Sequence, residues 1–234
     1  MSSAKADVLA RVRSALGPSP AVPDVPREYR AAGSLPTEGL VDRFCETVAE
    51  YRASVHRVVA DDLAATVRRI LGGAERVGVP PSLAEYGTVV DEGLSVAELD
   101  TLDAVVTGSA LAIADTGTIV LDSGPASGRR ALTLVPDHHV CIVEAATVVA
   151  SVPDAVAHLA EAAAAGRPIT FVSGPSATSD IELDRVEGVH GPRMLDVIVV
   201  SPRTGRDDHD PGVSSSGSEV VERPETESLN SRRP

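Results

Sequence analysis

The chain has almost no aromatic residues: Phe, Tyr and Trp together make up 2% of 234 residues, and Trp is absent. Its core must therefore be built from Val, Leu, Ile and Ala, which suits the β-rich interior of an α/β fold. Scarce aromatic rings argue against a base-stacking surface for single-stranded nucleic acid. The net charge of −13 also makes nucleic acid and acidic membrane surfaces poor partners.

Lysine, cysteine and long apolar runs are scarce as well. Lys5 is the only lysine, which excludes a Schiff-base lysine in the rest of the chain. Cys45 and Cys141 lie far apart among apolar neighbours, which predicts two reduced thiols in the core. Because iron–sulfur clusters typically need four cysteine ligands, this chain alone cannot hold one. No run approaches the roughly 18 apolar residues of a membrane span, so a cytoplasmic protein is expected.

Composition divides the chain into three parts. Residues 1–36 contain apolar positions at helical spacing and then a proline-rich stretch, which predicts a helical arm and an extended linker. Residues 37–202 form the predicted main domain. Residues 203–234 have few apolar side chains and cannot bury enough surface to offset the entropy of ordering, so we expect them to be disordered.

Within the main domain, the pattern predicts helices first and a sheet afterwards. Residues 37–71 are expected to form two helices, with His56 near their junction as a half-exposed surface histidine. Residues 153–165 predict a further helix that begins at a proline and ends at a glycine. Continuous apolar runs indicate a mixed sheet covered on both faces. Its expected strands are 76–79, 88–90, 104–107, 110–114, 118–122, 131–134, 139–143, 148–150, 169–172 and 195–200.

The segment 171–200 is the strongest candidate for a site. A buried strand is expected to end at a turn rich in glycine and hydroxyl groups, which we interpret as the start of a helix. A helix N-terminus binds anions, because its first N–H groups lack intrahelical partners and its dipole favours negative charge. The predicted ligand-binding residues here are Gly174, Ser176, Thr178 and Arg193, and the predicted catalytic residues are Glu182, Asp180 and His190.

The turn Asp115-Thr116-Gly117 resembles the DTG motif of aspartic proteases. Such a site needs a second carboxylate that shares a proton with the first. The nearby Asp122-Ser123-Gly124 is too close in sequence to come from a second lobe, so we reject this interpretation. Thr116 and Gly117 stay candidate ligand-binding residues, and a purely structural turn is the alternative.

Two further stretches carry ionisable side chains. Asp137-His138-His139 looks like a metal cluster, but adjacent residues of a strand point to opposite faces, so one segment cannot chelate with both histidines. We therefore predict no metal site and expect one histidine to face a pocket. Arg129 and Arg130 follow a flexible loop and either grip an anionic ligand or are simply solvated.

Three motifs together resemble the LUD-domain family: ADTGTIVLDSG at 114–124, RRALTLVPDHHVCIVE at 129–144 and SGPSATSDIELDRVEGVHGPRMLDVIVV at 173–200. The resemblance spans about residues 40–201 and departs from the family pattern at Asp115 and His138. It implies an α/β three-layer sandwich with a mixed, largely parallel sheet, as in ribose-5-phosphate isomerase, glucosamine-6-phosphate deaminase and CoA transferases. In that fold, ligands lie at the carboxyl ends of strands.

The resemblance also implies lactate utilization, the oxidation of L-lactate to pyruvate together with two iron–sulfur partner proteins. This chain has neither the cysteines for a cluster nor a dinucleotide or Walker motif. It is therefore expected to hold no cofactor and to be the non-redox component. The alternative is a small-carboxylate or phosphometabolite binding enzyme, or a regulatory module, that uses the strand-end pocket. The sequence leaves open whether the chain itself is an enzyme.

Overall fold

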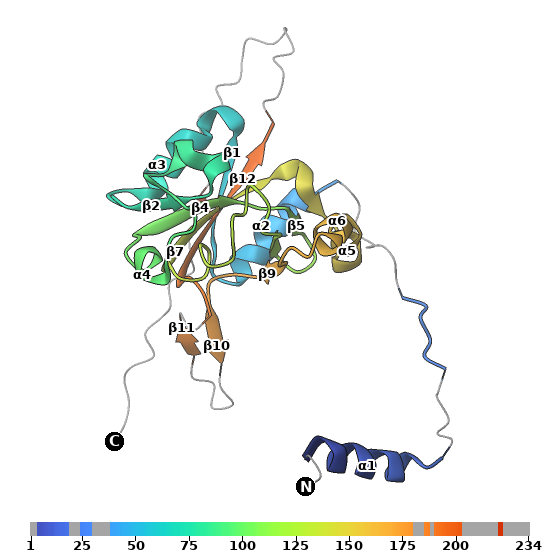
Figure 1. Ribbon diagram of the computed structural model, residues 1–234. Coiled ribbons are helices and arrows are strands. Elements are labelled where there is room, and N and C mark those ends of the chain that lie inside the picture. Colours follow the sequence, from blue (N-terminus) through green and yellow to red (C-terminus); the bar gives the residue numbers. More distant parts are fainter. Residues whose placement is uncertain are drawn as a thin grey trace, which may run out of the picture. The chain divides into compact units, whose positions relative to one another are not determined.

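The chain forms two units in the computed structural model, Met1–Arg30 and Ala31–Pro234. The first unit contains one helix, α1 (Ala4–Leu16), which has the bounds that its apolar spacing predicts and buries no side chain. The structure describes residues 4–18, 24–29, 38–179, 185–187, 190–202 and 220–221 (Figure 1).

A seven-stranded sheet is the centre of the second unit. Its strands are β1 (Ser54–Val59), β2 (Val77–Val79), β3 (Val89–Val90), β4 (Ala104–Gly108), β7 (His138–Glu144), β12 (Met194–Ser201) and β13 (Val220–Val221). Their order across the sheet is β13-β1-β12-β7-β4-β2-β3. All neighbours are parallel except β13, which pairs antiparallel with β1 at one edge.

A second sheet of four strands packs beside the first. Its strands are β5 (Leu111–Ile113), β6 (Thr118–Leu121), β8 (Val148–Val149) and β9 (Thr170–Val172). The order is β8-β5-β6-β9, so β9 lies at an edge. We expected this strand to be buried, but Phe171 at its centre is 48% exposed.

Helices and the second sheet cover the two faces of the large sheet. The helices are α2 (Leu40–Glu50), α3 (Leu63–Leu71), α4 (Val96–Leu99), α5 (Val152–His158) and α6 (Ala160–Ala164), with short 3-10 helices η1 (Ala60–Asp62), η2 (Pro81–Tyr86) and η3 (Ala145–Thr147). On one face, Phe44 of α2 packs in a cluster with Leu195 and the second sheet. On the other face, Val67 of α3 packs in a cluster with Ile198. The predicted α/β class with a mixed, largely parallel sheet is confirmed.

The segment predicted as two helices contains strand β1 between α2 and α3. This strand pairs in parallel with β12 from Ser54 to Val59, and Val55 and Val58 are buried. The prediction of a half-exposed surface histidine is wrong, because His56 lies within β1 and is 6% exposed. Pairing with a strand from the far end of the chain decides the structure of this segment, and local spacing does not reveal it.

Residues 131–134, predicted as a strand, form successive turns. The Leu132 N–H donates to the carbonyl of Arg129, and the Thr133 N–H donates to the carbonyl of Arg130. Leu132 is fully buried. Leu132 therefore fills the core without joining a sheet, whereas Leu134 is 40% exposed.

The prediction of a helix that begins directly after Ser176 is also wrong, whereas residues 180–184, into which it would continue, lie outside the described residues. Residues Ala177–Ser179 form strand β10, which pairs antiparallel with β11 (Arg185–Glu187). This hairpin extends away from the two larger sheets (Figure 1). An anion pocket at a helix N-terminus is consequently not formed at this turn.

Three findings concern other predicted features. Within 203–234, only Val220–Val221 of β13 is described, so the predicted disorder of the tail falls outside the described residues. Among the described helices, none has both the length and the apolar character needed to cross a membrane. Both cysteines are free and buried, as predicted.

Candidate anion-binding site

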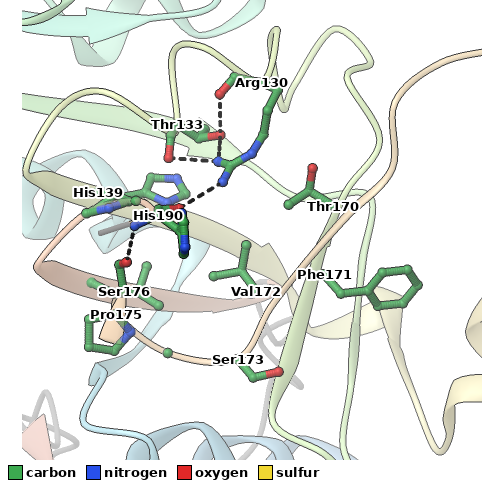
Figure 2. A pocket seen from close by; sticks show the side chains of 14 residues that line it. Arg130, Thr133, His139, Thr170, Phe171, Val172, Ser173, Pro175, Ser176 and His190 are labelled. Atoms are coloured by element: carbon green, nitrogen blue, oxygen red, sulfur yellow. Dashed lines mark hydrogen bonds between the residues drawn. The ribbon is translucent and has the colours of Figure 1, made fainter. Parts of the chain in front are cut away.

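A cavity of about 220 Å³ lies where the amino-terminal ends of β7 and β12 meet the loop that follows β9 (Figure 2). Its lining comes from three segments, 130–139, 170–176 and 190–195. The family resemblance implies ligands at carboxyl ends of strands. This cavity combines the carboxyl end of edge strand β9 with the opposite ends of the two central strands.

The root of the β10–β11 hairpin forms one wall of the cavity. The Ser176 N–H donates to the carbonyl of Pro192 over 2.7 Å, and the His190 N–H donates to the Ser176 hydroxyl over 2.9 Å. These two bonds hold the segments 173–176 and 190–192 side by side. Ser176 is therefore engaged in fixing the wall that faces the cavity.

Two glycines near the cavity allow their loops to pack closely against α2 and against Tyr51, the residue that follows it. A Cβ on Gly174 would lie 2.7 Å from the carbonyl oxygen of Tyr51, and its φ is +105°. A Cβ on Gly117 would lie 2.6 Å from the carbonyl carbon of Thr47, and its φ is +57°. Only glycine combines these backbone angles with so close an approach. The turn at Gly117 therefore has a packing function in this structure.

A chain of hydroxyl groups links that turn to the cavity. The Thr116 and Thr118 hydroxyls lie 2.7 Å apart, and the Thr118 and Ser173 hydroxyls also lie 2.7 Å apart. Ser173 lines the cavity. Thr116 thus reaches the site only through two other side chains.

Arg130 is the one arginine that lines the cavity among the described residues. Its Nη1 donates to the carbonyl and the hydroxyl of Thr133, each over 3.0 Å, and its Nη2 donates to the carbonyl of His190 over 3.3 Å. Burial lowers the pKa of Arg130 from its ordinary value. No carboxylate of the described residues pairs with it, so a half-buried positive charge is held by neutral oxygens alone.

The neighbouring Arg129 has a different role. Its Nε and Nη2 donate to the two carboxylate oxygens of Asp91 over 2.7 and 2.8 Å. Burial would raise the pKa of Asp91, but hydrogen bonds from Arg129 and from the backbone of Leu94 and Gly93 lower it. Of the two arginines that the sequence left undecided, Arg129 is a structural ion pair and Arg130 faces the cavity.

His139 lines the cavity from strand β7. It is 2% exposed, and its Nε2 lies 2.8 Å from the Thr107 hydroxyl. Burial, with smaller contributions from His138 and Arg130, lowers the pKa of His139 to about 3. The imidazole is therefore neutral at physiological pH and adds no charge beside Arg130.

On the face of the large sheet opposite to His139, two histidines contact one aspartate. The Nε2 atoms of His56 and His138 each lie 2.8 Å from a different carboxylate oxygen of Asp196. Burial would raise the pKa of Asp196, but the hydrogen bonds from the two histidines lower it to about 2. The prediction that His138 and His139 point to opposite faces is confirmed. Among the described residues, no group of His, Cys, Asp and Glu is arranged to hold a metal ion.

Sequence reasoning missed Arg130 as the leading site residue and missed Asp196 altogether. One signal was available: an aspartate inside the apolar run 194–200 must find partners, because burying an unpaired carboxylate is costly. Those partners come from two other strands and cannot be read from spacing.

The predicted site residues are distributed as follows. Gly174, Ser176 and His190 line the cavity. Arg193 is exposed and pairs with Asp137, with 3.0 Å between Nε and Oδ1. Thr178 contributes backbone to β10, and Asp180 and Glu182 lie outside the described residues.

A mixed α/β sheet with a small cavity, one partly buried guanidinium and a neutral histidine defines the class: an α/β protein with a candidate ligand site beside Arg130. The family model for the LUD domain matches residues 95–200, a range that includes every residue lining the cavity.

Named relatives extend the match beyond that range. Lactate utilization protein C of Deinococcus radiodurans is 42% identical over 204 residues, which cover 84% of this chain and 95% of the relative. The Bacillus subtilis protein of that name is 30% identical over 166 residues, covering 61% of this chain and 69% of the relative. A crystal structure of a DUF162 family protein from Deinococcus radiodurans superposes with a TM-score of 0.62 at 40% identity, covering 71% of this chain and 99% of that chain. The chain belongs to the Lactate utilization protein C family of LUD-domain proteins.

Proposed function

We propose that this chain is the anion-binding, non-redox component of a lactate utilization system that oxidises L-lactate to pyruvate. Its proposed partners are two iron–sulfur proteins that carry the clusters, and the chain itself holds no cofactor. Support comes from the name shared by its relatives and from its two cysteines. Burial raises the pKa of Cys45 to about 11 and that of Cys141 to about 12, so neither thiol is readily ionised for metal ligation. Free cysteines also suit the reducing cytoplasm, our proposed location.

The observation that carries the proposal is the environment of Arg130. A guanidinium that loses water and gains only neutral acceptors is poorly compensated. An anion in the cavity would supply the missing negative charge, and L-lactate and pyruvate are both small anions. The proposed role is thus to bind the carboxylate of a reactant or product close to the partner proteins.

The test is reconstitution with the two iron–sulfur proteins. The three chains would be co-purified, and lactate-dependent dye reduction measured with and without this chain. Omission is expected to abolish the activity, and Arg130→Gln is expected to lower it at least about tenfold, since a hydrogen bond to a charged group contributes about 1.5–3 kcal/mol.

Arg69→Gln is the matched control, because it removes the same charge from an exposed position of α3. It is expected to keep full activity. Dye reduction at the full rate without this chain, combined with no co-purification, would contradict the proposal.

A second candidate is an enzyme or regulatory module that acts on a small carboxylate or a phosphometabolite without these partners. The hydroxyls of Thr170, Ser173 and Ser176 around the cavity favour it, since they can orient a polar substrate. Full dye reduction without this chain, together with anion binding that depends on Arg130, would support this second function.

A further inference from the structure

We propose that the cavity selects short 2-hydroxy- and 2-oxo-monocarboxylates. Arg130 would hold the carboxylate through two parallel N–H groups, and His139 would recognise the oxygen on the second carbon. This inference rests on the proposed anion site at Arg130. It goes further in naming the ligand class and the residue that determines it.

The hydrogen bonds of Arg130 define which of its donors face a ligand. A guanidinium has five N–H donors. Both Nη1 donors are directed to Thr133, and one Nη2 donor is directed to His190. The Nε–H shares one edge of the group with an Nη2–H; no described residue accepts from Nε, and Nη2 has one donor beyond its bond to His190. Two parallel donors match the two oxygens of a carboxylate.

The position of this edge agrees with a ligand inside the cavity. The guanidinium points into the space bordered by His139, Thr170 and Val172, whereas Phe171 points away from Arg130 (Figure 2). Arg130 is the one arginine of the described lining, and the lining contains no lysine. A phosphate group carries up to two negative charges and three strong acceptor oxygens. One guanidinium with a single open edge matches a monocarboxylate better than a phosphate.

The cavity has a volume of about 220 Å³, below the roughly 300–1,000 Å³ of pockets for drug-sized ligands, so it suits a ligand of a few carbon atoms. L-Lactate and pyruvate have six non-hydrogen atoms. Val172 and Leu195 supply an apolar part of the lining, which suits a methyl group and offers no partner to a second carboxylate.

His139 is suited to recognise the second-carbon oxygen in either oxidation state. Its Nε2 contacts the Thr107 hydroxyl, which can donate or accept. The ring can therefore carry its proton on either nitrogen. Nδ1 makes no hydrogen bond within the described residues, so it is available to accept from a hydroxyl or donate to a carbonyl oxygen. A ligand without that oxygen leaves a buried polar group unpaired, and such a mismatch is strongly unfavourable.

The first experiment uses the full chain and four probes: L-lactate, pyruvate, propionate and inorganic phosphate. Ligand-observed NMR titration would give a dissociation constant for each. L-Lactate and pyruvate are expected to bind at least about tenfold more tightly than propionate, which lacks only the second-carbon oxygen, and more tightly than phosphate. Equal binding of propionate, tighter binding of phosphate or no binding of L-lactate and pyruvate would overturn the inference.

Variants assign the roles to residues. Arg130→Lys keeps the charge but removes the two-pronged edge, and it is expected to weaken L-lactate binding at least about tenfold. Arg69→Gln again serves as the charge control and is expected to bind like wild type. His139→Gln is expected to bring the ratio between L-lactate and propionate close to one. Because His139 is buried, Thr107→Val is a second variant that disturbs the ring without contacting the ligand, and thermal melts verify that each variant is folded.

The outcomes separate this inference from the proposed function. Equal binding of L-lactate and propionate, with both lost in Arg130→Gln, would overturn the specificity and leave the anion-binding component intact. Tighter binding of phosphate would overturn the carboxylate class and favour the phosphometabolite alternative. Absence of binding by any probe, together with an Arg130→Gln variant that is fully active in dye reduction, would overturn both.

Discussion

At the scale of single residues, Asp196 is the carboxylate expected to contribute most to the pH dependence of stability. It lies between His56 and His138, and its side chain is 13% exposed. The pKa falls from 3.8 to about 2 in the folded protein. A lowered carboxyl pKa stabilises the fold above the unfolded value, and that stability is lost as the pH falls through the folded value. Asp196 therefore stabilises the protein fully above about pH 4–5, and the contribution disappears towards pH 2.

Asp196→Asn is expected to lower the free energy of unfolding by about 2 kcal/mol at pH 7, following about 1.4 kcal/mol per pKa unit. Urea denaturation between pH 7 and pH 2.5 measures this, and the difference from wild type should shrink below about pH 4. Asp137→Asn, which removes an exposed pair with Arg193, is the control and should cost less than about 1 kcal/mol. A deficit that is independent of pH, or equal in the two variants, would contradict this account.

At this scale, the sequence predicted the position of a side chain only where the geometry of a single strand determines it. The alternation of side chains along β7 was sufficient to place His138 and His139 on opposite faces. The contacts of Arg130 and Asp196 depend on segments that are distant in sequence, so no spacing rule predicts them. Ser176 and His190 were correctly placed in one region, although the predicted reason was the start of a helix and Ala177–Ser179 form a strand instead.

At the scale of elements, the turn between β5 and β6 packs directly against the backbone of α2 at Gly117. A Cβ on Gly117 would lie 2.6 Å from backbone atoms of Thr47 and Val48, which cannot move aside as a side chain would. Gly117→Ala is therefore expected to destabilise the protein by about 2–4 kcal/mol, from the clash and the left-handed backbone together. Chemical denaturation would measure the loss.

Gly39→Ala provides a matched control for backbone strain. Gly39 has a left-handed backbone with φ +84° and ψ 1°, but a Cβ there meets nothing within 4 Å. This variant should cost about 1 kcal/mol, the left-handed penalty alone. Losses of the same size in the two variants would show that the approach to α2 contributes nothing.

Several elements were predicted because their local pattern and their tertiary environment agree. Strands β4, β6, β7 and β12 are apolar runs bounded by turns, and they form near the expected positions. Strand β1 was missed because the polar residues His56 and Arg57 interrupt its apolar pattern. Residues 131–134 show the reverse case: they were predicted as a strand, but they form turns that bury Leu132.

At the scale of the whole molecule, the first unit should contribute little to the stability of the second. Helix α1 buries none of its residues, so its removal takes no side chain from a core. Deletion of residues 1–30 is expected to change the melting temperature by less than about 2 °C, as for changes at exposed positions. Differential scanning calorimetry of the shortened chain would test this, and a fall of more than about 5 °C would contradict it.

The parallel pairing of β1 with β12 also has a consequence for biosynthesis. His56 and Asp196 are neighbours in the fold but lie 140 positions apart in the chain. At about 5–20 residues per second, a ribosome needs roughly 7–28 s to make β12 after β1. During that interval β1 lacks its parallel neighbour β12. The middle of the large sheet can form only when translation has passed residue 201. The nascent chain is therefore most exposed to aggregation, and most dependent on chaperones, until β12 has been made.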